Sequence, residues 1–280
     1  MTVRLTMDPA AFQKLVFPYL QRDPVLNSQV LTNVADRVRG IMNDPVPPVF
    51  VSVHDDTGEV VGAVICTALR GISMMGLPAE LVPPVAEVLA DAAPGAIGVF
   101  GSAAAAARAF AELYSERTGR SFREVDQARL HKLEVFVQQR ADGAPRLATE
   151  GDLDVVTPMF GAYRREVGHA DESPAADRTW LQQRVERERL WVWEDGGRIV
   201  TMVGHQSPVF GAVRVGPVYT PPEHRGRGYA SALTAEVTRR LQAAGDQVCL
   251  MTDLTNPTSN KIYAAIGYRP VQDFVGYAFT

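Results

Sequence analysis

Cysteine and lysine are scarce in this 280-residue chain. Only Cys66 and Cys249 are cysteines, and each lies inside an apolar run. Two cysteines exclude a disulfide framework and a cysteine-based metal site; we interpret them as buried thiols in a reducing cytoplasm. Lysine accounts for three of the 28 basic residues, and we attribute this preference for arginine to genomic base composition rather than to function.

Long apolar runs and an excess of positive charge are also missing. No stretch approaches the roughly 18 apolar residues of a membrane span, and the N-terminus has no basic segment followed by an apolar one, as a secretory signal would. Residues 1–145 carry 13 basic and 16 acidic side chains, and residues 146–280 carry 15 and 16. This balance argues against nucleic acid as the main partner. We therefore expect a cytoplasmic protein that binds neither nucleic acid nor membrane.

What the chain does have is the balance of a globular protein, with 46% hydrophobic and 21% charged residues. Its length predicts two domains. A weak repeat of about 140 residues supports that division, since Arg4–Asp8 and Arg146–Asp152 open two similar successions of elements.

Both halves are predicted to follow the order β-α-α-β-β-β-α-β-α-β. Helical patterns cover about 9–20, 27–42, 79–93 and 103–118 in the first half, and about 152–167, 175–189, 226–244 and 258–266 in the second. After the opening strands, extended segments are expected at 49–53, 60–64, 71–76, 96–101 and 130–137, and at 190–194, 199–203, 212–219, 247–252 and 276–280.

This succession predicts an α/β fold (α+β, mixed sheet) with helices on both faces. Gln138–Pro145 has turn-forming composition and is the expected linker. We therefore predict two domains, residues 1–140 and 146–280.

The sharpest local signal is Arg225-Gly226-Arg227-Gly228-Tyr229-Ala230, where a strand runs through a loop into a long helix. The two glycines let backbone N–H groups approach a ligand closely. The first N–H groups of the helix are unpaired and face the same point. Such a nest binds a pyrophosphate without a metal, and Arg225 and Arg227 add positive charge.

Three other kinds of glycine-rich loop precede helices: a P-loop, a dinucleotide-binding loop and a plain helix entry. A P-loop would end in Gly-Lys-Ser/Thr, which is absent. A dinucleotide fingerprint would have a third glycine where Ser231 stands, although Asp246 lies at the expected distance beyond it. A plain glycine-rich helix entry also remains open.

The loop resembles the Arg/Gln-x-x-Gly-x-Gly/Ala acyl-CoA loop of the GNAT N-acetyltransferase superfamily. The segment Asn256–Tyr268 resembles a second motif of that superfamily, Asn-x-x-Ala-x-x-Leu-Tyr-x-x-x-Gly-Phe, with Ser259, Ile262 and Tyr268 as departures. The resemblance covers about 146–280 and implies two tandem GNAT-like acyl-CoA N-acyltransferase domains.

The first half resembles the same fold in outline only. Its segment Gly76–Pro84 has neither paired glycines nor arginine, and Ala107 stands where the second motif has asparagine. We read residues 1–140 as a degenerate copy that binds no cofactor. One active site in each half is the alternative.

The resemblance implies acetyl-CoA as the acyl donor, bound where two strands splay apart. Pro217 has no N–H for strand pairing, so pairing is expected to break there. In this superfamily a backbone N–H at the Val218 position faces the thioester oxygen, as an oxyanion donor. The cofactor-binding residues implied are Val218, Tyr219, Thr220, Arg225, Gly226, Arg227, Gly228, Tyr229, Ala230, Asn256 and Tyr263.

The resemblance also makes Tyr263 the acid that protonates the leaving thiolate, with a packing role in the sheet as the structural alternative. The general base is left open among His205, Glu172, Asp171, His169 and Asp253. His205 and Glu172 enter our predicted catalytic set, against a structural histidine and a solvated loop. A water chain would serve without any dedicated base, and no metal is expected because helical His-x-x-x-His spacing is absent.

The function implied is an N-acetyltransferase, active in the second half. It would move an acetyl group from acetyl-CoA to an amine, which we expect to be a small molecule, by direct attack in a ternary complex. The alternative is a non-catalytic acyl-CoA-binding or regulatory module. For the first half, closure over the acceptor site and a homodimer interface both stay open.

Overall fold

The computed structural model describes residues 1–280 except 43, 45, 76, 103 and 169–172. The order of elements predicted from the sequence is confirmed in both halves, with short 3-10 turns added before three helices. No helix among the described residues has the length and apolarity needed to cross a membrane.

The elements of the first half follow in chain order. They are β1 (Thr2–Thr6), α1 (Pro9–Leu20), α2 (Ser28–Val38), β2 (Val49–His54), β3 (Val60–Thr67), β4 (Gly71–Met74), η1 (Ala79–Leu81), α3 (Val82–Ala92), β5 (Gly98–Ser102), α4 (Ala104–Thr118) and β6 (Phe122–Leu133).

The second half repeats this succession. Its elements are β7 (Ala144–Leu147), η2 (Glu150–Asp152), α5 (Leu153–Glu166), α6 (Pro174–Val185), β8 (Leu190–Asp195), β9 (Arg198–His205), β10 (Ala212–Tyr219), η3 (Pro222–His224), α7 (Tyr229–Ala243), β11 (Gln247–Asp253), α8 (Pro257–Ile266) and β12 (Tyr268–Phe279).

Local sequence explains where several helices begin. Asp8 caps α1 by accepting a hydrogen bond from the Ala10 N–H at 2.8 Å, and Pro9 opens the helix. Ser173 and Asn256 cap α6 and α8 in the same way, each followed by a proline. A polar capping residue followed by proline therefore marks the start of α1, α6 and α8.

All twelve strands form one continuous sheet in the order β1-β2-β3-β4-β5-β12-β6-β11-β10-β9-β8-β7. The pairs β4–β5 and β10–β11 are parallel, and the other pairs are antiparallel. The predicted mixed sheet is thus confirmed.

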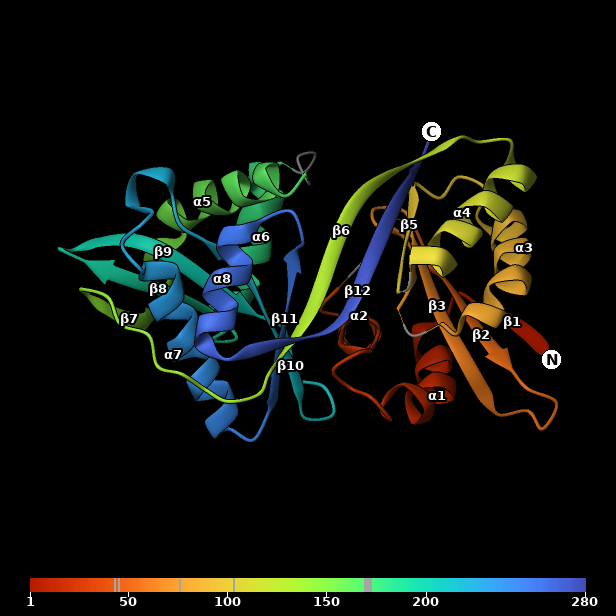
Figure 1. Ribbon diagram of the computed structural model, residues 1–280, viewed down its shortest axis with the longest axis horizontal. Coiled ribbons are helices and arrows are strands. Elements are labelled where there is room, and N and C mark those ends of the chain that lie inside the picture. The colour runs from red at the N-terminus through yellow and green to blue at the C-terminus, as the bar shows by residue number, and fades with distance from the viewer. Residues whose placement is uncertain (43, 45, 76, 103, 169–172) are drawn as a thin grey trace.

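The two halves exchange their last strands. β12, from the end of the chain, pairs with β5 of the first half, and β6 of the first half pairs with β11 of the second. β6 and β12 also pair with each other along almost their whole length, where they cross the centre of the molecule in Figure 1. Each half therefore supplies five strands of its own and receives the sixth from the other.

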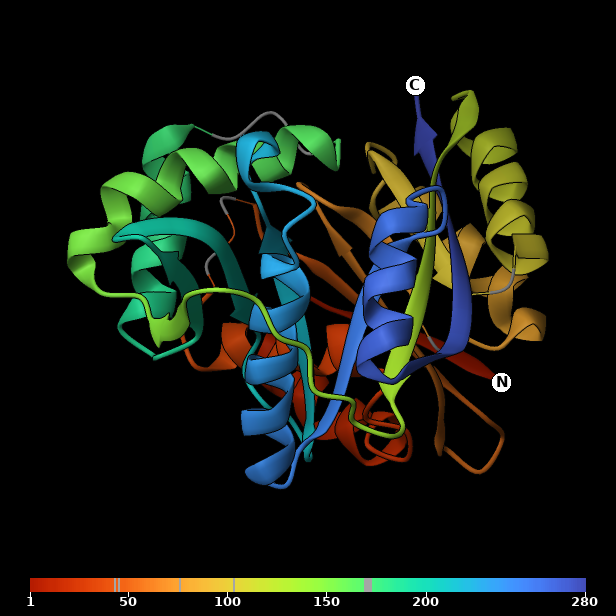
Figure 2. The ribbon, with the colours of Figure 1, turned by 60° about the vertical axis from the view of Figure 1, so that its left-hand side comes forward.

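The helices cover this sheet in four groups. α3 and α4 pack with the strands of the first half, and α5 and α6 with β8 and β9. α7 and α8 lie side by side against the second half (Figure 2). The core under α1 and α2 includes Ala212 and Cys249 of the second half. One apolar core thus joins the two halves beneath β10 and β11.

Two strand lengths differ from the prediction. β6 begins eight residues earlier than expected and β12 also begins eight residues earlier. Residues 123–127 of β6 are exposed, so their sequence lacks the alternation of apolar and polar side chains that predicts a strand. Their partner is the other exchanged strand, and only that pairing fixes them as extended backbone. The boundary between residues 1–140 and 146–280 stays a prediction.

Candidate active site

The site is built where β10 leaves β11. The parallel pairing between them ends at Val215 and Leu250, four residues before β10 itself ends. On the other side of β10, Val215 pairs with His205 and Val218 with Val203, so β10 has one residue more than β9 and bulges there. The break expected at Pro217 is confirmed, and it leaves the backbone of Gly216–Tyr219 unpaired toward β11.

The glycine loop follows at the end of this strand. Gly226 and Gly228 have φ of +79° and +82°, a region that favours glycine, and Gly228 is the residue before α7. All of Arg225–Gly228 is exposed. In the described part of the chain no acceptor pairs with the N–H groups of Gly226, Arg227 or Gly228. A Cβ placed on Gly226 would meet no atom within 4 Å, and one placed on Gly228 would lie 3.6 Å from the Arg140 carbonyl oxygen, so there is room for a ligand beside Gly226 near the start of the helix.

Arg225 is held by the protein itself. Its Nη2 lies 2.7 and 2.9 Å from the two carboxylate oxygens of Glu166, at the end of α5, and its Nε donates to the Thr220 carbonyl at 2.9 Å. The guanidinium also lies over the Tyr219 ring. These contacts fix the shape of the loop, and they place Glu166, which the sequence did not single out, beside the predicted phosphate site.

The other predicted loop residues divide by burial. Tyr229 is buried and its hydroxyl donates to the carboxylate of Asp195 in the β8–β9 hairpin. Arg227 is exposed and Ala230 half-buried. The Tyr229 side chain therefore anchors the first turn of α7 to the β8–β9 hairpin. The backbone N–H of Tyr229 stays beside the loop.

The second motif lies along α8, next to α7. Asn256 caps α8, and its Oδ1 accepts the Ser259 N–H at 3.1 Å. Tyr263 is buried against Tyr268, with ring centroids 6.2 Å apart. Burial raises the pKa of the Tyr263 phenol well above its ordinary value, and Tyr163 of α5 adds to that effect. The phenol is thus a group that stays protonated.

A strand of the first half reaches the base of α8. His131 of β6 is 4% exposed, and its Nε2 lies 3.2 Å from the Thr252 hydroxyl. That hydroxyl donates to Asn260 Oδ1 at 2.7 Å, so it accepts from His131 Nε2–H. Burial lowers the pKa of His131, which keeps the ring neutral. Sequence analysis missed this link because it depends on the strand exchange.

The candidate bases do not meet at one point in the described residues. His205 ends β9, is 8% exposed, and its Nδ1 donates to the Gln206 carbonyl at 3.0 Å. Burial lowers its pKa, and Arg189 and Arg184 add to that effect. Asp253 accepts hydrogen bonds from the N–H and hydroxyl of Thr255, as a turn residue does. The predictions at His169, Asp171 and Glu172 lie outside the described residues.

The predicted residues do not all lie together. Val218, Tyr229 and Tyr263 share one apolar cluster, so the end of β10, the start of α7 and α8 are neighbours; cofactor binding by the eleven predicted residues stays a prediction. His205 pairs with Val215, on the other side of the bulge from Val218. No group of three or more His, Cys, Asp or Glu side chains among the described residues is arranged to hold a metal ion.

The corresponding place in the first half is built differently. β4 and β5 pair over Ile72–Met74, and η1 leads directly into α3 through Pro78 and Val82. The described residues between β4 and η1 are Met75, Leu77 and Pro78, and the first two are buried. Whether this half binds a cofactor stays a prediction.

Comparisons with known proteins point to one fold. The model of the FR47-like protein family matches residues 206–275. Comparison with curated protein sequences gives no significant match.

Solved structures match over the whole chain. A GNAT-family acetyltransferase from Colwellia psychrerythraea is 12% identical, with 100% of both chains covered and a TM-score of 0.67. A GCN5-related N-acetyltransferase from Sphaerobacter thermophilus is 17% identical, covering 99% of this chain and 94% of that one, with a TM-score of 0.62. A tandem GNAT protein from the clavulanic acid biosynthesis pathway is 11% identical, covering 99% and 98%, with a TM-score of 0.57.

Proposed function

Because this chain carries the GNAT acetyltransferase fold twice in tandem, we propose that its second half is an acetyl-CoA-dependent N-acetyltransferase. The acceptor is an amine on a small molecule. The observation that carries this proposal is the open glycine loop at the end of a strand whose pairing has just been interrupted.

The loop supports the donor side of the proposal. Unpaired N–H groups at Gly226–Gly228 and the first turn of α7 suit the pyrophosphate of coenzyme A. The unpaired backbone of Gly216–Tyr219 suits the amides of its pantetheine arm, which would take the place of a strand between β10 and β11. Arg227 is exposed beside the loop and adds charge. Arg225 acts through Glu166, by keeping the loop in shape.

The proposed reaction is a direct displacement. The neutral amine attacks the thioester carbonyl, the C–N bond forms, the C–S bond breaks, and the thiolate takes a proton. In the resembling superfamily the N–H at the Val218 position stabilises the oxyanion. A donor of this kind is worth about 10²–10³ in rate. The bulge of β10 against β9 lies next to Val218, and the pairing of β10 with β11 has already ended at Val215.

Tyr263 suits the role of the acid. The phenol is protonated at neutral pH because burial raises its pKa. The same burial holds the proton more tightly, so the place of Tyr263 in the second motif, and not its pKa, supports this role. The amine's own proton leaves through water or through His205, whose lowered pKa makes the ring neutral and able to accept.

A covalent acyl-enzyme does not suit these residues. Cys66 and Cys249 are both buried and free. Burial raises the pKa of the Cys66 thiol to about 11, and that of Cys249 in the same direction. A protonated buried thiol is a poor nucleophile, so direct attack by the amine is the simpler route.

The test is release of free thiol from acetyl-CoA in the presence of a panel of primary amines. We expect turnover with at least one amine, and its loss in Gly226→Trp, whose indole would occupy the open space at the loop. Gly226→Ala is the matched control, because it brings the same positive-φ strain without the bulk.

Two results would contradict the proposal. Equal loss in both variants would mean that backbone strain rather than ligand space is at stake. Binding of acetyl-CoA with no turnover across the panel would favour a non-catalytic acyl-CoA module instead.

A further inference from the structure

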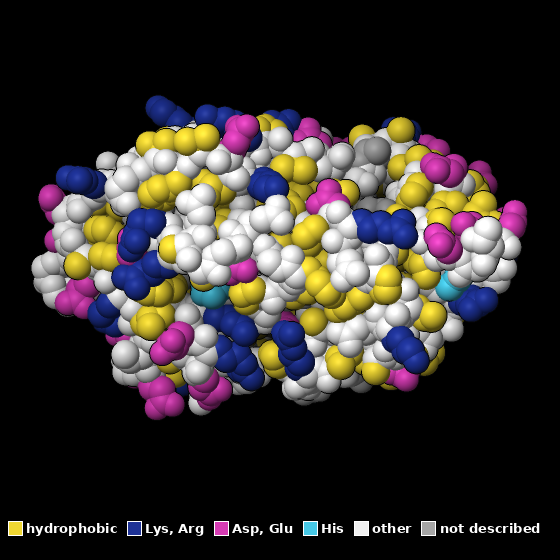
Figure 3. Space-filling model, turned by 90° about the horizontal axis from the view of Figure 1, so that it is seen from below, with side chains coloured by type: hydrophobic (Ala, Val, Ile, Leu, Met, Phe, Trp, Pro, Cys, Tyr) yellow, Lys and Arg dark blue, Asp and Glu magenta, His cyan; other side chains and the backbone are white. Residues whose placement is uncertain are grey.

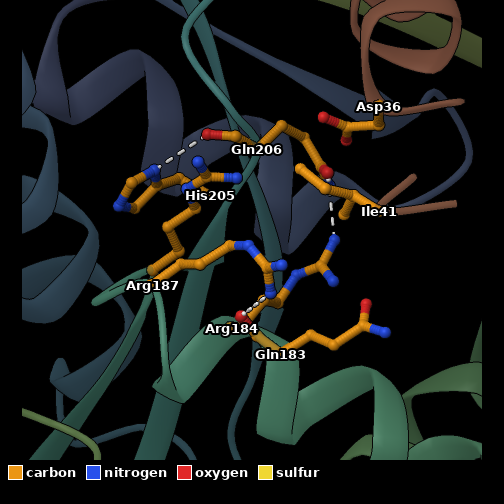
Figure 4. A pocket seen from close by; sticks show the side chains of 8 residues that line it. Asp36, Ile41, Gln183, Arg184, Arg187, His205 and Gln206 are labelled. Carbon is orange, nitrogen blue, oxygen red and sulfur yellow. Dashed lines mark hydrogen bonds between the residues drawn. The ribbon is translucent and has the colours of Figure 1, made fainter. Parts of the chain in front are cut away.

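A pocket lies where the two halves meet, away from the glycine loop. It is open to solvent and is formed by α2 and the segment after it from the first half, and by α6, β9 and their flanks from the second. Its lining residues are Asp36, Ile41, Gln183, Arg184, Arg187, Arg189, His205 and Gln206. Figure 4 shows Asp36 and Ile41 on one side, and the α6 side chains facing them.

Positive charge dominates this pocket. Arg184, Arg187 and Arg189 face a single carboxylate, Asp36. No described carboxylate lies within ion-pair distance of Arg184 or Arg189, and Arg187 has only Glu186 at 3.9 Å. Figure 3 shows Lys and Arg side chains grouped on the left-hand part of the lower face, the side on which the second half lies in Figure 1.

The guanidinium of Arg184 is held ready for a ligand. It stacks over the Trp180 ring, and its Nη2 donates to Gln206 Oε1 at 3.0 Å. Its Nε is buried and has no partner in the described residues. A buried, unpaired guanidinium N–H is costly unless something accepts from it.

The one carboxylate is already bonded. Asp36 Oδ1 accepts the Ser207 hydroxyl at 3.0 Å, and that hydroxyl accepts in turn from Arg189 Nη1. Burial lowers the pKa of Arg184 and of Arg189, and Asp36 acts against that effect on both. Three arginines thus face one carboxylate that is already hydrogen-bonded, so the lining carries more basic than acidic side chains.

The pocket adjoins the proposed reaction site but not the phosphate loop. His205 in its wall pairs with Val215, the last residue of β10 that pairs with β11. From Val215 to Tyr219, where the loop begins, a strand covers roughly 13 Å at 3.3 Å per residue. The pocket therefore lies beside the middle of β10, away from the end of the strand that leads into the loop.

We propose that this pocket binds an oxyanion, a carboxylate or a phosphate, carried by the acceptor amine. Arg184 and Arg189 hold the group, because an arginine fork matches the two oxygens of either anion. The acceptor role rests on the proposed acetyl transfer, whereas the binding of the oxyanion does not.

Binding is tested first, without any enzyme assay. The full-length protein is titrated in a calorimeter at low ionic strength with succinate and, separately, with inorganic phosphate. We expect one site per chain that remains in Gly226→Trp, where the glycine loop is blocked, for at least one probe, and the better probe identifies the anionic group. Binding of neither probe at millimolar concentration would overturn the proposal.

Variants with opposite effects separate binding from folding. Arg184→Gln should weaken the better probe at least about tenfold, the scale of one lost charged hydrogen bond. Asp36→Asn removes the only lining carboxylate and should strengthen binding. Arg178→Gln, on the same helix but paired with Asp154, is the control and should change nothing. Equal affinities in all three would overturn the proposal. Arg189→Gln replaces Arg184→Gln if melting curves show that the latter is unfolded.

The acceptor role is tested with matched amines. Glycine, β-alanine and 4-aminobutyrate are compared with their amides, and phosphoethanolamine with ethanolamine. We expect at least about a tenfold preference in kcat/KM for one charged member over its neutral partner, and a smaller preference in Arg184→Gln. Equal use of charged and neutral partners would overturn the role.

The acetyltransferase proposal and the oxyanion-pocket proposal fail with different experimental results. Acetyl-CoA binding without succinate or phosphate binding removes this inference and leaves the acetyltransferase. The reverse result removes the acetyltransferase and the acceptor role, and leaves an oxyanion pocket.

Discussion

Burial decides how the titratable side chains of this site behave. It raises the pKa of Tyr263 and lowers that of His205 and His131. The phenol therefore keeps its proton, and both imidazoles stay neutral. At the residue scale, the chain presents a protonated phenol and neutral imidazoles at the same pH.

The first prediction concerns Tyr263. Tyr263→Phe should lower kcat by about 10²–10⁴, the usual contribution of a positioned acid, with little change in acetyl-CoA affinity. Steady-state kinetics and calorimetry on the same preparation measure the two effects. A kcat within a few-fold of the wild type would assign Tyr263 to packing.

The pH profile gives a second prediction at this scale. Because the Tyr263 pKa is raised, its proton is present at all pH values up to the ordinary phenol pKa of about 10 and is lost only above it. Loss of the Tyr263 proton should therefore cause no decrease of kcat between pH 7 and pH 10. Any decrease in that range should be the same in Tyr263→Phe. Such a Tyr263-dependent fall near pH 8 would contradict the burial of the phenol.

Single elements are held in place by a few polar contacts. Arg146 of β7 makes two hydrogen bonds to Asp152, at 2.7 and 2.9 Å, and Asp152 Oδ2 accepts the Thr149 N–H at 2.7 Å. These bonds join β7 to the turn that starts α5, the helix that carries Glu166. They also lower the pKa of Asp152 to about 2, with Arg146 as the main cause.

Asp152→Asn should therefore destabilise the chain by about 1–2 kcal/mol. The lowered pKa means that the contribution is complete above pH 4 and fades as pH falls through about 2. Urea unfolding at pH 7 and at pH 3 measures the difference from wild type at each pH. A difference that grew on acidification would contradict this account.

The whole molecule depends on the exchange of β6 and β12. Removing residues 1–140 takes away β6, which pairs with β11, and β5, which pairs with β12. It also removes α1 and α2, which share a core with Ala212 and Cys249. The second half alone would keep an unpaired central edge and an exposed apolar face.

Residues 146–280 expressed alone should consequently be insoluble or aggregated. Co-expression with residues 1–143 should restore a soluble complex with the oligomeric mass of one full chain, measured by light scattering. A fragment 146–280 that is folded, monomeric and active would show that the exchange is dispensable.

Features formed within one half, such as the helices and the glycine loop, could be predicted from the sequence. Features formed between the halves, such as the full length of β6 and the arginine pocket, could not. Periodicity and caps located the helices, and the spacing of Gly226 and Gly228 located the loop. The length of β6 was missed because its exposed residues 123–127 become a strand only by pairing with β12. Arg184 and Arg189 were missed because arginine is the dominant basic residue throughout, so no local pattern distinguishes an arginine that faces a pocket.

The most direct test of the central claim is the calorimetric titration of the purified chain with acetyl-CoA. The account predicts one site per chain, retained in Gly226→Ala and lost in Gly226→Trp. Two sites would mean that the first half also binds the donor. No binding at all would contradict the acetyltransferase and leave the fold without its proposed substrate.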